Sequence, residues 1–125
     1  MRFARHLFLF AGVSGLLLLV PQYFLESYNA RNFPPPLTHP EYFYGFVGVA
    51  AAFQIVFLII SRDPVRFRPM MLAGVAEKFS FSIACFTLFA LGRVHPAITV
   101  FAAMDAVLGI LFIAAFVKTK RADWP

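Results

Sequence analysis

The 125-residue chain has few charged residues and a single cysteine. Charged side chains make up 14% of the composition, whereas a soluble globular domain carries roughly 25%. The lone Cys85 excludes an intrachain disulfide, a CxxC redox pair and a cysteine-rich metal site. No phosphate-binding loop, HExxH motif or nucleophile–base spacing occurs, and His39 and His95 lack any accompanying ligand pattern. We therefore predict no metal site, identify no cofactor and favour a non-enzymatic role.

Hydrophobic residues, by contrast, make up 61% of the chain and gather in four runs, at about 7–25, 43–60, 70–91 and 97–117. Each run has about the 20 residues that a helix needs to cross a hydrocarbon core of roughly 30 Å. We predict an all-α fold, a single transmembrane domain (1–125) that forms a four-helix bundle in the lipid bilayer. A signal peptide also fits the first run, but Pro21-Gln22-Tyr23 follows it in place of a small-residue cleavage site. The first helix is therefore predicted to be retained.

The longest polar segment, Glu26–Glu41, contains Pro34-Pro35-Pro36 and Pro40. Because prolines disrupt a helix and favour a polyproline-like course, we predict an extended, stiff connector without a helix. A proline-rich ligand for a partner domain is the alternative. Four tyrosines around this segment are typical of a membrane interface: Tyr23, Tyr28, Tyr42 and Tyr44.

The net charge of +5 comes from basic residues at the ends of the apolar runs, not from a basic stripe interleaved with aromatics, so we predict no nucleic-acid binding. Most Lys and Arg residues flank one side of the four runs: Arg2, Arg5, Arg62, Arg66, Arg68, Lys118, Lys120 and Arg121. The other side has Arg31 and Arg93. Because basic flanks stay in the cytoplasm, we predict a multi-pass membrane protein with both termini cytoplasmic.

Each apolar run contains a polar residue near its middle. With a rise of about 1.5 Å per residue, these side chains lie roughly 12 to 21 Å below the outer face. We predict that they meet in one polar cluster: Ser14, Gln54, Glu77, Lys78 and Asp105. Lys78 is expected to reach Asp105. Glu77 points about 100° away from Lys78 around the helix, so we expect it either to be protonated or to bond Gln54, Ser14 or water. Ionisable groups at this depth mark a functional site by default, with simple fastening of helices as the alternative.

Helical spacing predicts which faces are buried. On the third run, residues three and four apart share the face that carries the cluster: Gly74, Glu77, Lys78, Phe81, Ala84, Cys85 and Leu88. The opposite face is predicted to contact lipid: Val75, Phe79, Ile83 and Phe86. The motifs Ala11-x-x-x-Gly15 and Gly48-x-x-x-Ala52 supply small residues of the kind that lets membrane helices approach closely.

Three segments carry a resemblance to known proteins. They are PPPLTHPEYFYGF before the second helix, the basic turn RDPVRFRP, and the turn GRVHP before the fourth helix. With the helix order and chain length, they make the chain similar to small bacterial four-helix membrane proteins of the DoxX-like group. That resemblance implies a location in the bacterial inner membrane and an association with quinone-linked oxidoreductase systems, and no catalytic motif carries over. Small multidrug transporters have a similar size, but their essential carboxylate lies in the first helix, where this chain has none inside the membrane.

Three functions remain open. We favour either an accessory subunit of a membrane complex, such as a quinone-linked redox complex, or a binder of an apolar ligand such as a quinone or isoprenoid. The partners would be other membrane proteins or further copies of this chain. The first alternative is a small oligomeric proton-coupled transporter or channel in which Glu77 exchanges protons. The second is a membrane enzyme that acts on a lipid and uses the carboxylates as acid and base.

Overall fold

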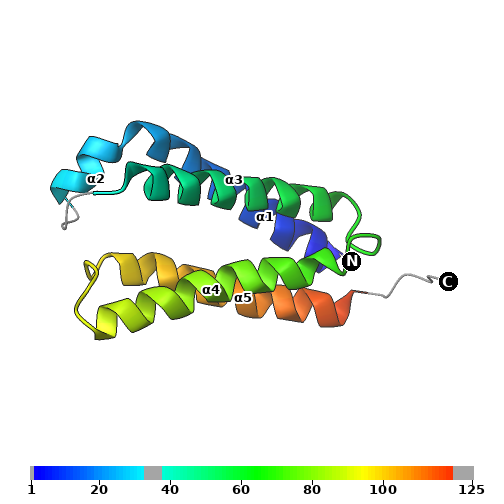
Figure 1. Ribbon diagram of the computed structural model, residues 1–125. Coiled ribbons are helices and arrows are strands. Elements are labelled where there is room, and N and C mark those ends of the chain that lie inside the picture. The colour runs from blue at the N-terminus through cyan, green and yellow to red at the C-terminus, as the bar shows by residue number, and fades with distance from the viewer. Residues whose placement is uncertain (1, 33–37, 120–125) are drawn as a thin grey trace.

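The computed structural model describes residues 2–32 and 38–119, which form helices and connecting turns with no strand in those ranges. The elements are α1 (Arg2–Leu19), the 3₁₀ helix η1 (Val20–Phe24), α2 (Glu26–Asn32), α3 (Pro40–Arg62), α4 (Met70–Ala90) and α5 (Ile98–Lys118) (Figure 1). Four spans in the described part of the chain are long and apolar enough to cross a membrane: α1 with η1, α3, α4 and α5. The predicted all-α class with four candidate transmembrane helices is confirmed.

The ends of the long helices follow local signals. The α-helical geometry of α1 stops at Leu19 and continues as η1, in whose first positions Pro21 lies, because proline cannot donate a helical hydrogen bond. Pro40, by contrast, begins α3, where the missing N–H costs nothing. Gly92 ends α4 with a φ of 70°, and Arg93 N donates to Leu88 O at 2.8 Å. This left-handed glycine closes the last turn of the helix.

The prediction of no helix in Glu26–Glu41 is wrong at both ends, because Glu26–Asn32 forms α2 and Pro40 and Glu41 begin α3. The residues of α2 precede the prolines, and this helix has an acidic residue in its first turn and Arg31 in its last, as the helix dipole favours. Two side-chain contacts hold α2 against its neighbours. Asn29 Nδ2 donates to Gln22 Oε1 at 2.8 Å, and the Tyr44 hydroxyl donates to Glu26 Oε2 at 2.8 Å. The predicted extended course of Pro34-Pro35-Pro36 lies outside the described residues.

The long helices are arranged as two antiparallel pairs, α1 with α3 and α4 with α5, which lie one over the other (Figure 1). The pairs are joined by a core at the end of the bundle where α1 begins. Phe8 of α1 and Phe112 of α5 stack there with ring centroids 4.3 Å apart, and Phe57 of α3 meets Phe112 at 5.0 Å. The same core includes Ala4, Leu7, Ala11, Ile60, Met71 and Ala115. The bundle is therefore packed most tightly at this end.

Small residues bring α1 and α3 together. A Cβ atom on Gly12 would lie 2.8 Å from the Gln54 carbonyl oxygen, and one on Gly15 would collide with the Gln54 side chain. This agrees with the predicted role of the Ala11-to-Gly15 motif. The second predicted motif does not work this way. Gly48 lies near the Tyr23 hydroxyl, and Ala52 is exposed.

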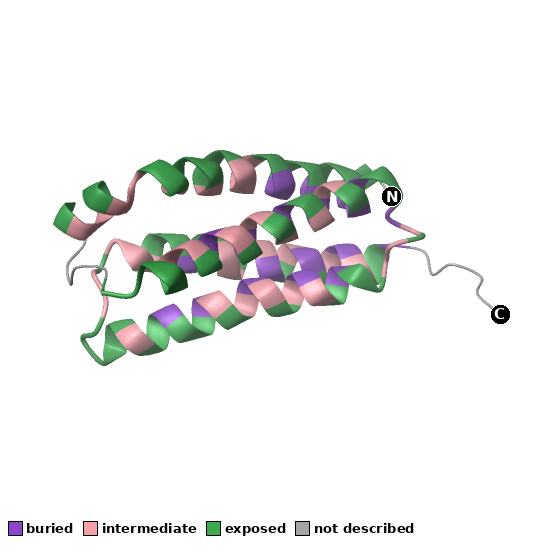
Figure 2. Cartoon of the chain, turned by 45° about the horizontal axis from the view of Figure 1, so that its top comes forward, coloured by how far each residue is buried: buried purple, intermediate pink, exposed green. Residues whose placement is uncertain are grey.

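The outer surface of the bundle is apolar. Buried residues line the inside of the helices, whereas exposed ones cover their outward sides (Figure 2). Large exposed hydrophobic side chains occur on every long helix, and examples are Leu17, Val49, Ile83 and Ile110. Apolar exposure of this extent is unusual for a soluble monomer, and it suits a surface that contacts hydrocarbon.

Candidate functional site

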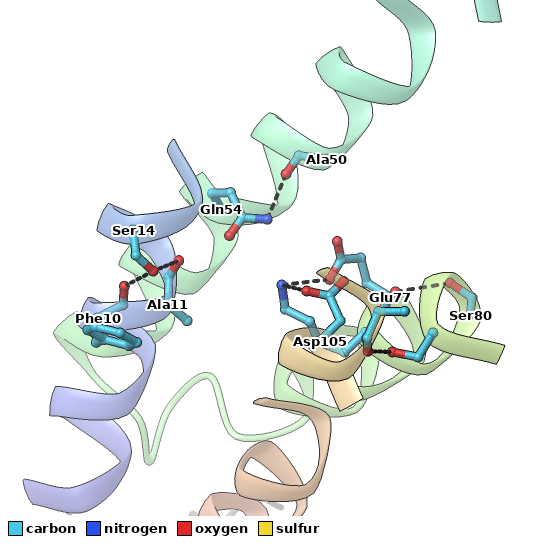
Figure 3. Close-up of polar contacts among 11 residues, drawn as sticks. Phe10, Ala11, Ser14, Ala50, Gln54, Glu77, Ser80 and Asp105 are labelled. Atoms are coloured by element: carbon cyan, nitrogen blue, oxygen red, sulfur yellow. Dashed lines mark hydrogen bonds and ion pairs between the residues drawn. The ribbon is translucent and has the colours of Figure 1, made fainter. Parts of the chain in front are cut away.

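Lys78 lies between two carboxylates at the middle of the α4–α5 pair. Its Nζ is 3.4 Å from Asp105 Oδ1 on α5 and 3.6 Å from Glu77 Oε2 on α4 (Figure 3). The exposed fractions of the side chains are 6% for Lys78, 17% for Glu77 and 21% for Asp105. We call these three residues the charged cluster. It is largely shielded from solvent, so its charges interact strongly.

The sequence builds this cluster by placing small residues around it on both helices. On α4, Gly74 and Ser82 lie one turn before and after Lys78, and all three are buried. On α5, Ala102 and Gly109 flank Asp105 and are also buried. Such residues let two backbones approach closely. The approach brings Ser82 Oγ to within 2.7 Å of the Ala102 carbonyl oxygen, to which it donates a hydrogen bond.

The aromatic core supports the cluster from one side. Lys78 Nζ lies 5.4 Å from the centroid of the Phe57 ring, a distance at which a cation and an aromatic ring attract each other. Phe57 itself is fully buried and contacts the space around Gly74, whose Cβ would lie 3.0 Å from its ring. The lysine therefore connects α4, α5 and α3.

The structure brings together three of the five predicted site residues and leaves two apart. Ser14 Oγ donates to Phe10 O on its own helix at 2.7 Å, and Gln54 Nε2 donates to Ala50 O at 2.9 Å (Figure 3). Serine commonly bonds the carbonyl four residues earlier in a helix, which removes its need for another partner. The oxygen Oε1 of Gln54 is buried with no hydrogen-bond partner.

Two further expectations need correction. Glu77 was expected not to face Lys78, but the flexible four-carbon stem of Lys78 lets its ammonium contact both carboxylates. Phe79 was expected to face lipid, but it packs on Gly109, where a Cβ would lie 2.7 Å from the Phe79 ring. Val75, on the same face, is half-buried against the aromatic core, whereas Ile83 and Phe86 are exposed as predicted.

A pocket of about 420 Å³ lies between α3 and α4, beyond the tightly packed end of the bundle. Its lining residues are Gly45, Phe46, Val49, Ala50, Glu77, Ser80 and Phe81. Val49 and Phe46 are exposed, with 62% and 48% of their surface accessible, so the pocket opens on the outside of the bundle. We call it the lateral pocket. Sequence analysis placed Glu77 and Phe81 on one face of α4. It did not predict the residues of α3 that line the other side of the pocket, because no signal in the sequence indicates which helix packs against that face.

Glu77 is the charged residue that lines the lateral pocket. Its Oε2 is buried and accepts no hydrogen bond, although Lys78 lies at ion-pair distance. The only other polar side chain in the lining belongs to Ser80, whose hydroxyl donates to the Glu77 carbonyl oxygen at 3.0 Å. Within the described ranges, no group of three or more His, Cys, Asp and Glu side chains is placed to hold a metal ion. The arrangement can offer a carboxylate to the polar end of an otherwise apolar molecule.

Comparison with known proteins gives no family assignment. No protein-family model matches the chain, and no curated protein or solved structure is significantly similar to it. The resemblance to the DoxX-like group stays a prediction from the quoted segments. Function is therefore inferred from the chain's own geometry.

Proposed function

We propose that this chain is a multi-pass protein of the bacterial inner membrane that binds an apolar ligand with one polar end group in the lateral pocket. The observation that carries the proposal is a pocket with apolar walls and one carboxylate, open on a surface suited to lipid. Pockets of about 300 to 1,000 Å³ with few polar groups are typical of small-molecule sites. The ligand enters sideways from the bilayer.

The proposed orientation has both termini in the cytoplasm. It is supported by the distribution of basic residues over the two ends of the bundle. Those at the end where α1 begins and α5 stops are Arg2, Arg5, Arg62, Arg66, Arg68 and Lys118, whereas Arg31 and Arg93 lie at the other end. Short basic flanks remain on the cytoplasmic side of a membrane. The lateral pocket then extends from the outer half of α3 to the middle of α4.

The cost of the charged cluster supports a binding role over simple fastening of helices. Each charge in a hydrocarbon layer costs about 2.5–3.5 kcal/mol on insertion scales, whereas a hydrogen bond between membrane helices contributes about 0.6 kcal/mol on average. Fastening α4 to α5 requires no more than the Ser82–Ala102 hydrogen bond and small-residue packing that are already present. The carboxylate of Glu77 lines the pocket and can also bind a ligand, which gives a reason to keep a charge there.

The proposal is tested by filling the pocket. Gly45 lines it, and a Cβ there would meet no heavy atom within 4 Å, so Gly45→Phe adds a ring at the pocket wall without displacing the backbone. The protein is purified in mild detergent, and bound lipids and quinones are identified by native mass spectrometry. We expect a stoichiometric apolar molecule on the wild type and its loss in Gly45→Phe.

Ala52→Phe is the matched control, because Ala52 lies on α3, is exposed and does not line the pocket. It should retain the molecule. Wild-type protein that is monodisperse and carries no bound lipid, quinone or other apolar molecule would contradict the proposal. Recovery of stoichiometric protein partners without a ligand would favour the accessory-subunit function instead.

A second candidate function is a small proton-coupled transporter or channel. The specific observation in its favour is an ionisable triad at mid-helix, in which Glu77 lines the pocket and Lys78 connects it to Asp105. Paired ionisable groups inside membrane helices are typical of proton pathways. The test is proton flux into liposomes containing the purified protein. Flux that persists unchanged in Glu77→Gln would eliminate this candidate.

A further inference from the structure

The charged cluster holds more negative than positive charge. Two carboxylates, Glu77 and Asp105, share one cation, Lys78. Every other Lys and Arg of the chain belongs to a helix end, to α2 or to a connecting or terminal segment, as the sequence and the helix bounds state. With all three groups ionised, the cluster has a net charge of −1. An uncompensated charge in a low-dielectric interior is costly, so the site favours one further positive charge.

The lateral pocket is where that charge can be supplied. Of the two carboxylates, Glu77 lines the pocket and Asp105 does not. Oε2 of Glu77 is buried and lies 3.6 Å from Lys78 Nζ, whereas the other oxygen of this carboxylate points away from the ion pair (Figure 3) and is the one that can accept a hydrogen bond from a ligand. Gln54, from α3, is polar but uncharged, and its amide nitrogen is engaged by Ala50 O.

Two aromatic side chains of the lining add to this preference. The rings of Phe46 on α3 and Phe81 on α4 stack with centroids 5.8 Å apart, and both line the pocket. Aromatic faces attract cations, and the attraction increases when water is excluded. A ligand with an anionic end group would instead meet the carboxylate of Glu77 at short range, which is repulsive.

Resting on the proposed binding function, we propose that the lateral pocket selects amphiphiles whose polar end is a protonated amine. The ammonium group donates to Glu77 and brings the charged cluster to neutrality, while the alkyl part lies between α3 and α4 against Phe46 and Phe81. An alcohol of the same length fits the same space and leaves the charge of the cluster unchanged. The selectivity therefore depends on the sum of the charges, not only on the group that the ligand touches.

The test compares three photoactivatable probes with the same twelve-carbon diazirine chain and an amine, hydroxyl or carboxylate end. The full-length protein is placed in nanodiscs of phosphatidylcholine, whose neutral headgroup gives the amine no general advantage. Labelled residues are identified and quantified by mass spectrometry at equal mole fractions of probe. We expect the amine to label the pocket residues of α3 and α4 roughly tenfold more than the alcohol, the difference between a charge-assisted and a neutral hydrogen bond. The carboxylate should label least.

Two variants separate the charge sum from the local contact. Glu77→Gln removes the carboxylate from the pocket, and Asp105→Asn neutralises a residue outside it. Each leaves the cluster without net negative charge, so each should reduce the ratio of amine to alcohol labelling towards one. A ratio that stays high in Asp105→Asn overturns the charge-sum argument. Elution as a single species in size-exclusion chromatography verifies that each variant is folded. If neither variant folds, the ratio of amine to alcohol labelling in the wild type still tests the amine selectivity.

The outcomes distinguish this inference from the proposed function. Equal labelling by amine and alcohol in the wild-type pocket would overturn the amine selectivity and leave the apolar-ligand function standing. Labelling of the pocket by none of the three probes would overturn both. Preferential labelling by the carboxylate would also reject the inference.

Discussion

Lys78 Nζ lies 3.4 Å from Asp105 Oδ1 and joins α4 to α5 near the middle of both helices. The same ammonium group lies 3.6 Å from Glu77 Oε2, so one lysine serves two carboxylates. This shared contact links the packing of the α4–α5 pair to the carboxylate that lines the lateral pocket. Changes at the cluster should therefore affect both stability and binding.

Removing the lysine should destabilise the protein strongly. Lys78→Met leaves the partly buried Glu77 and Asp105 without a cation, and we expect a loss approaching the roughly 3 kcal/mol that breaking a fully buried ion pair costs. The free energy of unfolding is measured in mild detergent by denaturant titration followed by circular dichroism. Adding Asp105→Asn to Lys78→Met should recover part of the loss. Arg93→Met, at an exposed position in the turn between α4 and α5, serves as the control and should lie within about 0.5 kcal/mol of the wild type.

Two serines of similar depth should behave differently when changed to alanine. Ser82 Oγ donates across to the Ala102 carbonyl oxygen, whereas Ser14 Oγ bonds its own helix. We expect Ser82→Ala to lower the free energy of unfolding by about 0.6 to 1.7 kcal/mol, the range for hydrogen bonds between membrane helices. Ser14→Ala should have almost no effect on stability or on probe labelling. Equal losses in the two variants would mean that Ser14 has a partner outside α1.

The Phe79 contact should make Gly109 intolerant of larger side chains. A Cβ on Gly109 would lie 2.7 Å from the Phe79 ring, so Gly109→Val forces α4 and α5 apart at a cost of about 1–3 kcal/mol. Gly45→Ala is the matched control, because no heavy atom lies within 4 Å of its Cβ, and alanine favours the helix. Thermal unfolding of the two variants should therefore shift in opposite directions. A Gly109→Val protein as stable as the wild type would be inconsistent with the α4–α5 contact.

The proposed orientation predicts which loops an impermeant reagent can reach. In a Cys85→Ala background, Ser27→Cys on α2 should react with a membrane-impermeant maleimide added to intact spheroplasts. Arg66→Cys, between α3 and α4, should react only after the membrane is permeabilised. Both positions are exposed in the folded chain, so access depends on the side of the membrane. If Arg66→Cys reacts in intact spheroplasts and Ser27→Cys reacts only after permeabilisation, both termini face the outside and the proposed orientation is wrong.

Much of the fold could be predicted because its signals are local. Apolar runs bounded by prolines and charges predicted α4 as 70–91 and α5 as 97–117, against Met70–Ala90 and Ile98–Lys118 in the structure. The error at α2 has a physical reason as well. The prolines restrict the residues beside them, and Glu26–Asn32 lies far enough before them to form a helix.

The sequence by itself determined the number and approximate extent of the apolar helices, and the presence of Glu77, Lys78 and Asp105 within them. Only the tertiary structure decided that Phe8, Phe57 and Phe112 close one end of the bundle while a pocket lined by Glu77 lies beyond them. The reason is that helix formation depends on neighbours along the chain. Which helices pair depends on small residues and ridges on separate helices that fit one another. A single sequence does not state that fit.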